Sequence, residues 1–242
     1  MKLAYMKKMD RIIRLAGTRD PDEILACMGF IYLDPGKSLQ GFIAKRKNTV
    51  YYGVNKKFTA QKYAFCSFHE AYHGLCGHLD TPDFLQNGGH SETYQSYGNV
   101  AKTEREANIG AADTVIDTEA FLEMVGYDSA DVQAYTRSVE SFEQAVEDYR
   151  THYEIVIANG SPEARIRRME AYQSELSRMY AELQEQAQDI LNAGICLSVP
   201  EIAHEYGVPE HVVHLKYEAV AIRKYKVPSL ELPAFDKVFG GW

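Results

Sequence analysis

The apolar side chains of residues 132–156 recur in alternating steps of three and four without a slip. Such a seam predicts a long helix that packs along one side against a second helix. The stretch 159–165 then breaks the pattern, with Gly160 as a stop, Ser161 as a cap and Pro162 at the first position of a new helix. Two long helices joined by a short turn are expected to form an antiparallel hairpin with arms of roughly 40 Å. The seam comprises Val132, Tyr135, Val139, Phe142, Val146, Tyr149, Tyr153 and Val156, then Met169, Tyr172, Leu176, Met179, Leu183, Ala187 and Ile190.

The predicted hairpin is also the most acidic part of the chain. Residues 130–193 hold twelve aspartates and glutamates against six arginines and no lysine, and so carry most of the net charge of −8. This balance lacks the basic surface that phosphate binding requires, so nucleic acid is not expected as the main partner. We expect either an inserted arm for docking a partner or for self-association, or a spacer packed against the rest of the chain.

The composition is that of a folded protein without a membrane anchor. A chain of 242 residues with 45% hydrophobic content can bury a sizeable core. No stretch approaches 18 consecutive apolar residues, so neither a signal peptide nor a membrane span is expected. The four cysteines lack clustered pair spacing and are interpreted as reduced thiols, which favours the cytoplasm.

The first half of the chain predicts a mixture of helix and strand. Asp20 can cap a helix that has Pro21 at its first position and Gly29 at its end. The run LQGFIAKRKNTVYYGVN, residues 39–55, contains two β-prone segments around a polar tetrapeptide and predicts a hairpin. A helical apolar stripe follows, so the fold class is expected to be α+β. The stripe comprises Phe65, Phe68, Tyr72, Leu75 and Leu79.

Within that helix the stretch FHEAYHGLCGH, residues 68–78, places His69 and His73 four positions apart. On a helix they share one face, where both imidazoles can converge on one metal ion. Glu70 can then act as general base on a metal-bound water, which is the logic of the HExxH motif in zinc peptidases. The alternative is a helix with two ordinary surface or core histidines.

A catalytic zinc site needs a third protein ligand, which the sequence offers 31 residues after His73 in EREAN. Glu104 and Glu106 are two positions apart, so only one of them can face the ion. We choose Glu104 because it shares its helix face with Asn108, which could support a ligand by a hydrogen bond. The alternative for Glu104 is a solvated glutamate on a helix surface.

Other residues of the two segments are expected to play different roles. Cys66 and Cys76 are about 15 Å apart along a helix and cannot both join the histidines on one ion, so they are interpreted as small buried residues. On a continuing helix His78 lies opposite His69 and is expected to cap the helix end or face solvent. Three residues of the intervening loop could donate hydrogen bonds to a developing oxyanion, namely His90, Tyr94 and Tyr97.

With these residues assembled, the chain resembles the ImmA/IrrE-type metallopeptidases of bacteria, phages and mobile elements. The resemblance covers residues 18–116: a leading helix and strand, a hairpin, a phenylalanine-led HExxH helix and a glutamate helix. It implies a zincin-like, gluzincin-type protease fold with one zinc ion on His69, His73 and Glu104. It also implies that Glu70 is the catalytic acid and base, and that the substrate is a helix-turn-helix repressor of phage, mobile-element or stress genes.

The rest of the chain extends beyond that minimal domain. We expect a metallopeptidase domain at residues 1–127, the acidic hairpin at 128–193 and a helix-turn-helix-like segment at 194–242. Residues 199–242 hold five basic and six acidic residues, so this segment is interpreted as a small structural bundle rather than a DNA reader. Two further functions stay open: a non-catalytic antirepressor or adaptor that uses its metal structurally, and a DNA-binding regulator.

Overall fold

The structure, a computed structural model, describes residues 1–36, 39–80, 102–158 and 161–232 of the chain. It has an α+β architecture with one small mixed sheet and mostly helices, as the sequence predicts. The chain divides into two units. The first unit combines Met1–Phe121 with Val199–Tyr225, and the second combines Leu122–Ser198 with the residues from Lys226 onward.

The sheet of the first unit has three strands in the order β1-β3-β2. β2 (Gly41–Arg46) and β3 (Thr49–Val54) form the predicted antiparallel hairpin, and β1 (Ile31–Tyr32) pairs in parallel with β3. The hairpin turns at Lys47, which has a positive φ of 54°. Among the described residues β2 pairs only with β3, so it is an edge strand of the sheet.

Helices make up the rest of the first unit. Asp20 caps the second helix as predicted, because its Oδ1 accepts a hydrogen bond from the backbone N–H of Glu23 at 3.0 Å. The N-terminal helix was not predicted. No helix in the described ranges is long and apolar enough to cross a membrane. The helices are α1 (Leu3–Ala16), α2 (Pro21–Cys27), α3 (Ala60–Leu75), the short 3₁₀ turn η1 (His78–Asp80), α5 (Lys102–Val115), α6 (Thr118–Met124), α9 (Val199–Tyr206) and α10 (Glu210–Ile222).

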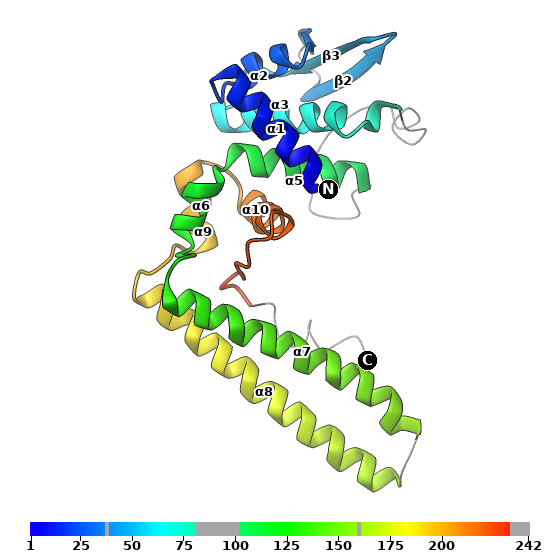
Figure 1. Cartoon of the computed structure of the whole chain (residues 1–242), viewed down its shortest axis with the longest axis vertical. Helices are drawn as coiled ribbons and strands as arrows, with labels where there is room; N and C mark the ends of the chain where they lie inside the picture. Colours follow the sequence, from blue (N-terminus) through cyan, green and yellow to red (C-terminus); the bar gives the residue numbers. More distant parts are fainter. Residues whose placement is uncertain (37–38, 81–101, 159–160, 233–242) are drawn as a thin grey trace. The chain divides into compact units, whose positions relative to one another are not determined.

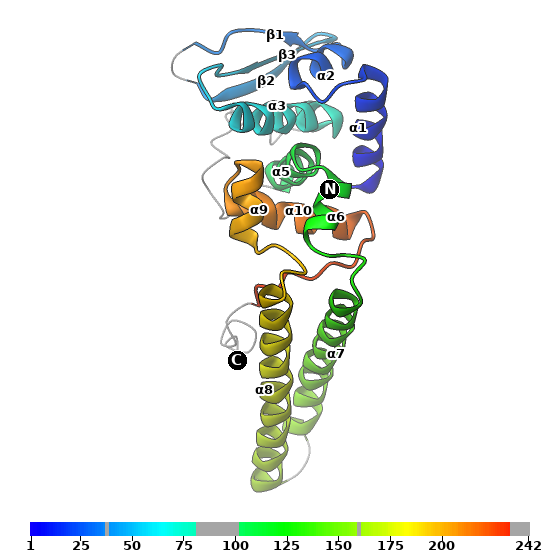
Figure 2. The same ribbon diagram turned by 90° about the vertical axis from the view of Figure 1, so that its left-hand side faces the viewer.

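The elements of the first unit are stacked in layers. Figures 1 and 2 both show the sheet, α3, α5 and α10 following one another in that order. α3 and α5 approach closely at Gly110, where a Cβ atom would lie 2.5 Å from the Tyr72 ring. The residues of the apolar stripe predicted for α3, from Phe65 through Leu79, are all buried.

The helix-turn-helix-like segment is part of the first unit rather than a separate one. The sequence analysis sets residues 194–242 apart, whereas the structure groups Val199–Tyr225 with Met1–Phe121. Lys216 of α10 is fully buried, and its Nζ donates hydrogen bonds to Asp113 Oδ1 at 2.8 Å and Thr118 Oγ1 at 2.7 Å. Arg223 bridges Asp113 and Asp10. Buried ion pairs therefore tie α10 to the C-terminal end of α5.

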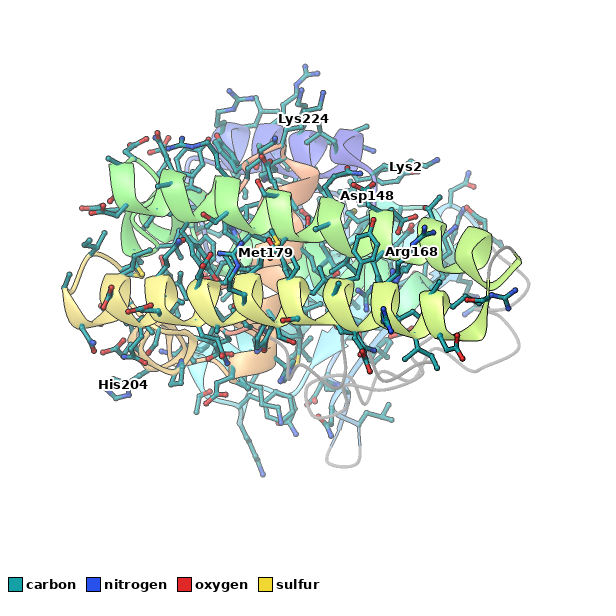
Figure 3. The ribbon with its side chains drawn as sticks, turned by 90° about the horizontal axis from the view of Figure 1, so that it is seen from below. Lys2, Asp148, Arg168, Met179, His204 and Lys224 are labelled. Carbon is teal, nitrogen blue, oxygen red and sulfur yellow. The ribbon has the colours of Figure 1, made fainter. Side chains whose placement is uncertain are left out.

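The second unit contains the predicted antiparallel hairpin. Figure 3 shows α7 (Ala130–Ala158) and α8 (Pro162–Asn192) side by side, with Asp148 on α7 and Met179 on α8. At 1.5 Å per residue the arms are about 45 Å long. Most seam residues with described side chains pack together. Met169 and Tyr172 do not belong to the packed cluster, and Tyr172 is 38% exposed, whereas Tyr180, outside the predicted seam, is buried in it. The side chains of Tyr153 and Val156 lie outside the described residues.

Candidate metal centre

The HExxH stretch lies on α3 in the interior of the first unit. The helix begins after Thr59, whose side chain accepts a hydrogen bond from the backbone N–H of Lys62 at 3.3 Å. The strands pack on one side of α3 and α5 packs on the other, so the polar residues of the motif are shielded from solvent. His69, Glu70 and His73 are each only 1% exposed. Buried ionisable groups need partners, and the two histidines have theirs on α5.

Three side chains converge between α3 and α5. The Nε2 atoms of His69 and His73 are 2.9 Å apart. Glu104 Oε2 lies 3.3 Å from His69 Nε2, and Glu104 Oε1 lies 3.3 Å from His73 Nε2. A tetrahedral ion with ligand bonds of about 2.0 Å holds its ligand atoms about 3.3 Å apart. The spacing of the three donors therefore fits one ion of the size of zinc.

The chemistry of this donor set also fits a metal ion. His69, His73 and Glu104 together form a group that could hold an ion. Two imidazoles and one carboxylate are a ligand set that suits zinc and leaves a fourth position for water or substrate. Glu104 Oε2 is buried without a well-formed hydrogen bond among the described residues, a state that a bound cation would relieve.

The protonation of these groups follows from their burial and mutual contacts. Burial lowers the pKa of His73 to about 4, so its imidazole is neutral and able to coordinate at neutral pH. Burial alone would raise the pKa of Glu104, but the adjacent imidazoles of His69 and His73 hold it well below its usual range. For His69, burial lowers the pKa, yet the carboxylates of Glu104 and Glu70 outweigh burial and raise it.

Glu70 is a buried carboxyl beside this group. Burial raises its pKa to about 8, against the opposing effect of His69. Its Oε1 atom is buried and has no hydrogen-bond partner among the described residues. A Cβ atom on Gly41, the first residue of edge strand β2, would lie 3.1 Å from that oxygen. Glu70 therefore directs an unsatisfied oxygen toward the start of an edge strand.

The structure separates the two candidate glutamates of α5. Glu104 faces the histidines, as the sequence analysis expects from the face that it shares with Asn108. Asn108 Oδ1 lies 2.9 Å from His69 Nδ1. An Nδ1–H of His69 can therefore donate to this amide oxygen, which leaves Nε2 free to coordinate a metal. Glu106 points elsewhere, and its Oε2 lies 3.2 Å from His78 Nε2.

His78 was expected to cap the helix end or face solvent, and this expectation is wrong. Its side chain is buried, and its Nδ1 lies 3.1 Å from Nδ1 of His73. The expectation extended α3 through residue 78, but the helix ends at Leu75 and Gly77 takes a left-handed φ of 77°. The chain then turns His78 back toward His73 in η1. A glycine just after a helix is the signal that could have predicted this reversal.

The remaining predicted residues fall into two groups. All four cysteines are free thiols, and neither Cys66 nor Cys76 belongs to the His69–His73–Glu104 group, as expected. Cys76 instead lies near His78 and Glu106, and these three ligand atoms are within 4.8 Å of one another. The oxyanion candidates lie outside the described residues, namely His90, Tyr94 and Tyr97.

Comparisons with known proteins do not assign the chain to a family. No protein-family model matches it, and neither a curated protein nor a solved structure does. The functional interpretation therefore depends on the residues of the site and on the sequence motifs.

Proposed function

We propose that this chain is a zinc-dependent endopeptidase with a zincin-like catalytic unit. The observation that carries the proposal is the position of Glu70, which is buried next to three converging metal ligands and has an oxygen without a partner among the described residues. A purely structural metal site has no need of a buried carboxyl that coordinates nothing. A hydrolytic site needs one as general base.

The chain's own residues divide the work of hydrolysis as follows. His69, His73 and Glu104 hold the zinc ion, which when bound polarises a carbonyl group and makes water more acidic. Glu70 takes the proton of the attacking water on its Oε1 and passes it to the nitrogen of the leaving amine. Asn108 accepts from Nδ1–H of His69 and so keeps Nε2 directed at the ion.

The edge strand β2 is the proposed site of substrate capture. An extended peptide can add to such an edge through main-chain hydrogen bonds. The strand begins at Gly41, whose missing side chain leaves room in front of Glu70 Oε1. A peptide bond at that end of the strand would lie next to the general base.

The proposed substrate is a helix-turn-helix repressor or a similar regulator of phage, mobile-element or stress genes. This part of the proposal comes from the family resemblance of residues 18–116. The acidic hairpin, which holds twelve acidic residues against six arginines, has the charge to attract the basic surface of a DNA-binding protein. DNA itself is a poorer candidate partner, because α10 buries much of its surface in the first unit.

The experiment that tests the proposal uses Glu70→Gln in the full chain. With a neighbouring helix-turn-helix repressor as substrate, we expect the wild type with zinc to cleave it and the variant to bind zinc without cleaving. Zinc content is measured by elemental analysis and cleavage by mass spectrometry of the repressor. Cleavage by Glu70→Gln would contradict the mechanism. If the wild type and Glu70→Gln both release the repressor from its DNA without cleaving it, the adaptor function is favoured.

The ligand assignment has its own control in the two glutamates of α5. Glu104→Ala removes a direct donor and should lose zinc at stoichiometric concentrations, while Glu106→Ala should still bind one ion. Both variants remove one carboxylate from the N-terminal half of α5, so the change in helix charge is the same in both. The reverse pattern would refute the assignment of Glu104.

A further inference from the structure

A series of polar contacts extends from His73 Nδ1, the ring nitrogen that does not face Glu104; it is buried at His73 and His78 and partly buried at Glu106. His73 Nδ1 lies 3.1 Å from His78 Nδ1, and His78 Nε2 lies 3.2 Å from Glu106 Oε2. Glu106 Oε1 in turn lies 3.1 Å from the α-amino group of Met1. His78 is only 4% exposed. Neither His78 nor Glu106 has a part in the proposed reaction.

When His73 coordinates a metal, the ring nitrogens of His73 and His78 can carry their protons in one consistent arrangement. Coordination through Nε2 requires the proton of a neutral His73 to sit on Nδ1. That Nδ1–H faces His78 Nδ1, which must then accept and so carry no proton. His78 therefore bears its proton on Nε2 and donates it to the carboxylate of Glu106. In this arrangement each N–H donor between His73 and Glu106 has an acceptor.

Resting on the proposed metal site, we propose that His78 and Glu106 form a positioning relay that fixes the tautomer and orientation of His73. Metal-binding histidines depend on such a partner for the second ring nitrogen, and its loss costs about tenfold to 100-fold in metal affinity. Asn108 serves His69 directly from α5. His73 is served instead through a second histidine, which the left-handed Gly77 turns back toward it.

The same proton arrangement decides between the relay and a second metal site. Cys76, His78 and Glu106 place three ligand atoms within 4.8 Å of one another and could hold an ion by themselves. An ion on His78 Nε2 would move the proton of His78 to Nδ1. Two N–H groups, those of His73 and His78, would then face each other at 3.1 Å. Filling the first site therefore disfavours coordination of a second ion by Nε2 of His78, and we expect one ion per chain.

The experiment compares four variants of the full chain by zinc affinity, measured by competition with a chromophoric chelator, and by the visible absorption of bound Co²⁺. His78→Leu removes the acceptor and should weaken zinc binding about tenfold to 100-fold. His78→Asn keeps an acceptor oxygen near the position of Nδ1 and should restore most of the affinity. Glu106→Gln should fall between these two, and Cys76→Ser should leave both the affinity and the Co²⁺ spectrum unchanged.

The outcomes separate the relay from its alternatives. If His78→Asn binds zinc as weakly as His78→Leu while both keep the wild-type circular dichroism spectrum, the acceptor role of His78 is refuted. A wild-type stoichiometry of two ions that falls to one in Cys76→Ser would replace the relay with a second metal site. Failure of the wild type to bind zinc would overturn the proposed function itself, whereas the other results concern only the relay.

Discussion

The charge of the Glu70 side chain depends on whether a metal ion is bound to the neighbouring side chains. Burial raises the pKa of its carboxyl to about 8, so in the chain without metal the neutral form is favoured at neutral pH. A divalent cation on His69, His73 and Glu104 would favour the carboxylate, because an opposite charge nearby lowers the pKa of an acid. At neutral pH, this arrangement gives a base that is mainly neutral without the metal and mainly ionised with it.

The raised pKa of Glu70 predicts how the metal-free chain responds to pH. A carboxyl whose folded pKa is about 8 contributes stability below its ordinary value of 4.5, and that contribution is lost as the pH rises toward 8. Glu70→Gln cannot ionise and escapes the loss. In chelator, we expect this variant to unfold several degrees above the wild type at pH 8 and close to it at pH 5. Thermal melts followed by circular dichroism measure this, and a difference independent of pH would contradict it.

Asp113, unlike Glu70, is a buried carboxylate whose removal should be costly. It accepts hydrogen bonds from the fully buried Lys216 and also pairs with Arg223. Asp113→Asn leaves Lys216 buried without its counter-ion and should lower the free energy of unfolding by about 3–5 kcal/mol. Asp10→Asn is the matched control, because Asp10 is 40% exposed and its only ion pair among the described residues is with Arg223, so its loss should cost less than about 1 kcal/mol. Equal costs in urea titrations would refute this difference.

The sequence predicted that the candidate ligands on regular helices come together, but it did not predict the residues behind them. His69 and His73 follow from helical spacing, and the choice of Glu104 over Glu106 follows from the face shared with Asn108. His78 was misplaced because its position depends on the backbone turn at Gly77 rather than on periodicity. The burial of a charged residue such as Lys216 could not be predicted, since it depends on which surface α10 packs against.

Among the elements, α5 contributes most to both the site and the core. Its first turn carries Glu104, its middle packs on α3 and its last turn carries Asp113. The close approach to α3 depends on Gly110, because any side chain there would enter the ring of Tyr72. Glycine in the middle of a helix usually weakens the helix. Here its missing side chain also sets the distance between α3 and α5, the two helices that carry the candidate ligands.

Gly110→Ala should therefore separate α3 from α5. A Cβ atom 2.5 Å from the Tyr72 ring forces a shift of the backbone, since the contacted atoms lie at the base of the ring as well as along its edge. We expect a loss of about 1–3 kcal/mol in unfolding free energy and weaker zinc binding, because Glu104 moves away from the histidines. Adding Tyr72→Leu should recover part of both losses by making room. Absence of any recovery would show that the clash is not the cause.

At the scale of the whole molecule, the two ends of the segment that carries the α7–α8 hairpin lie next to each other. The backbone N–H of Leu197 donates to the carbonyl of Met124 at 2.8 Å, so the two ends of the second unit meet. The heptad seam predicted the two arms of the hairpin, since its spacing is a local property of the sequence. The division of the chain was not predictable in the same way, because the return of Val199–Tyr225 to the first unit depends on contacts across about 100 residues of sequence.

This connection predicts which parts of the chain can be removed. Replacing residues 128–194 with a short glycine-serine linker should leave the first unit folded and its zinc affinity close to that of the full chain. Removing residues 199–242 should instead abolish folding or zinc binding, because it exposes the surface that α10 covers on α5. Circular dichroism and chelator competition on the two shortened proteins measure this. A folded, zinc-binding chain without residues 199–242 would show that the first unit ends before α9.

The buried ion pair between Lys216 and Asp113 connects the proposed metal site to α10, a helix that contributes no candidate ligand. Glu104 and Asp113 belong to the same fourteen-residue helix, so an opening that frees α10 and unfolds α5 with it would also release Glu104 from the proposed metal site. By mass action, zinc at 100 times its dissociation constant opposes such an opening by about 2.7 kcal/mol. Amide hydrogens of α10 should accordingly exchange with deuterated solvent up to about 100-fold more slowly in zinc, while those in the middle of α8 exchange at an unchanged rate.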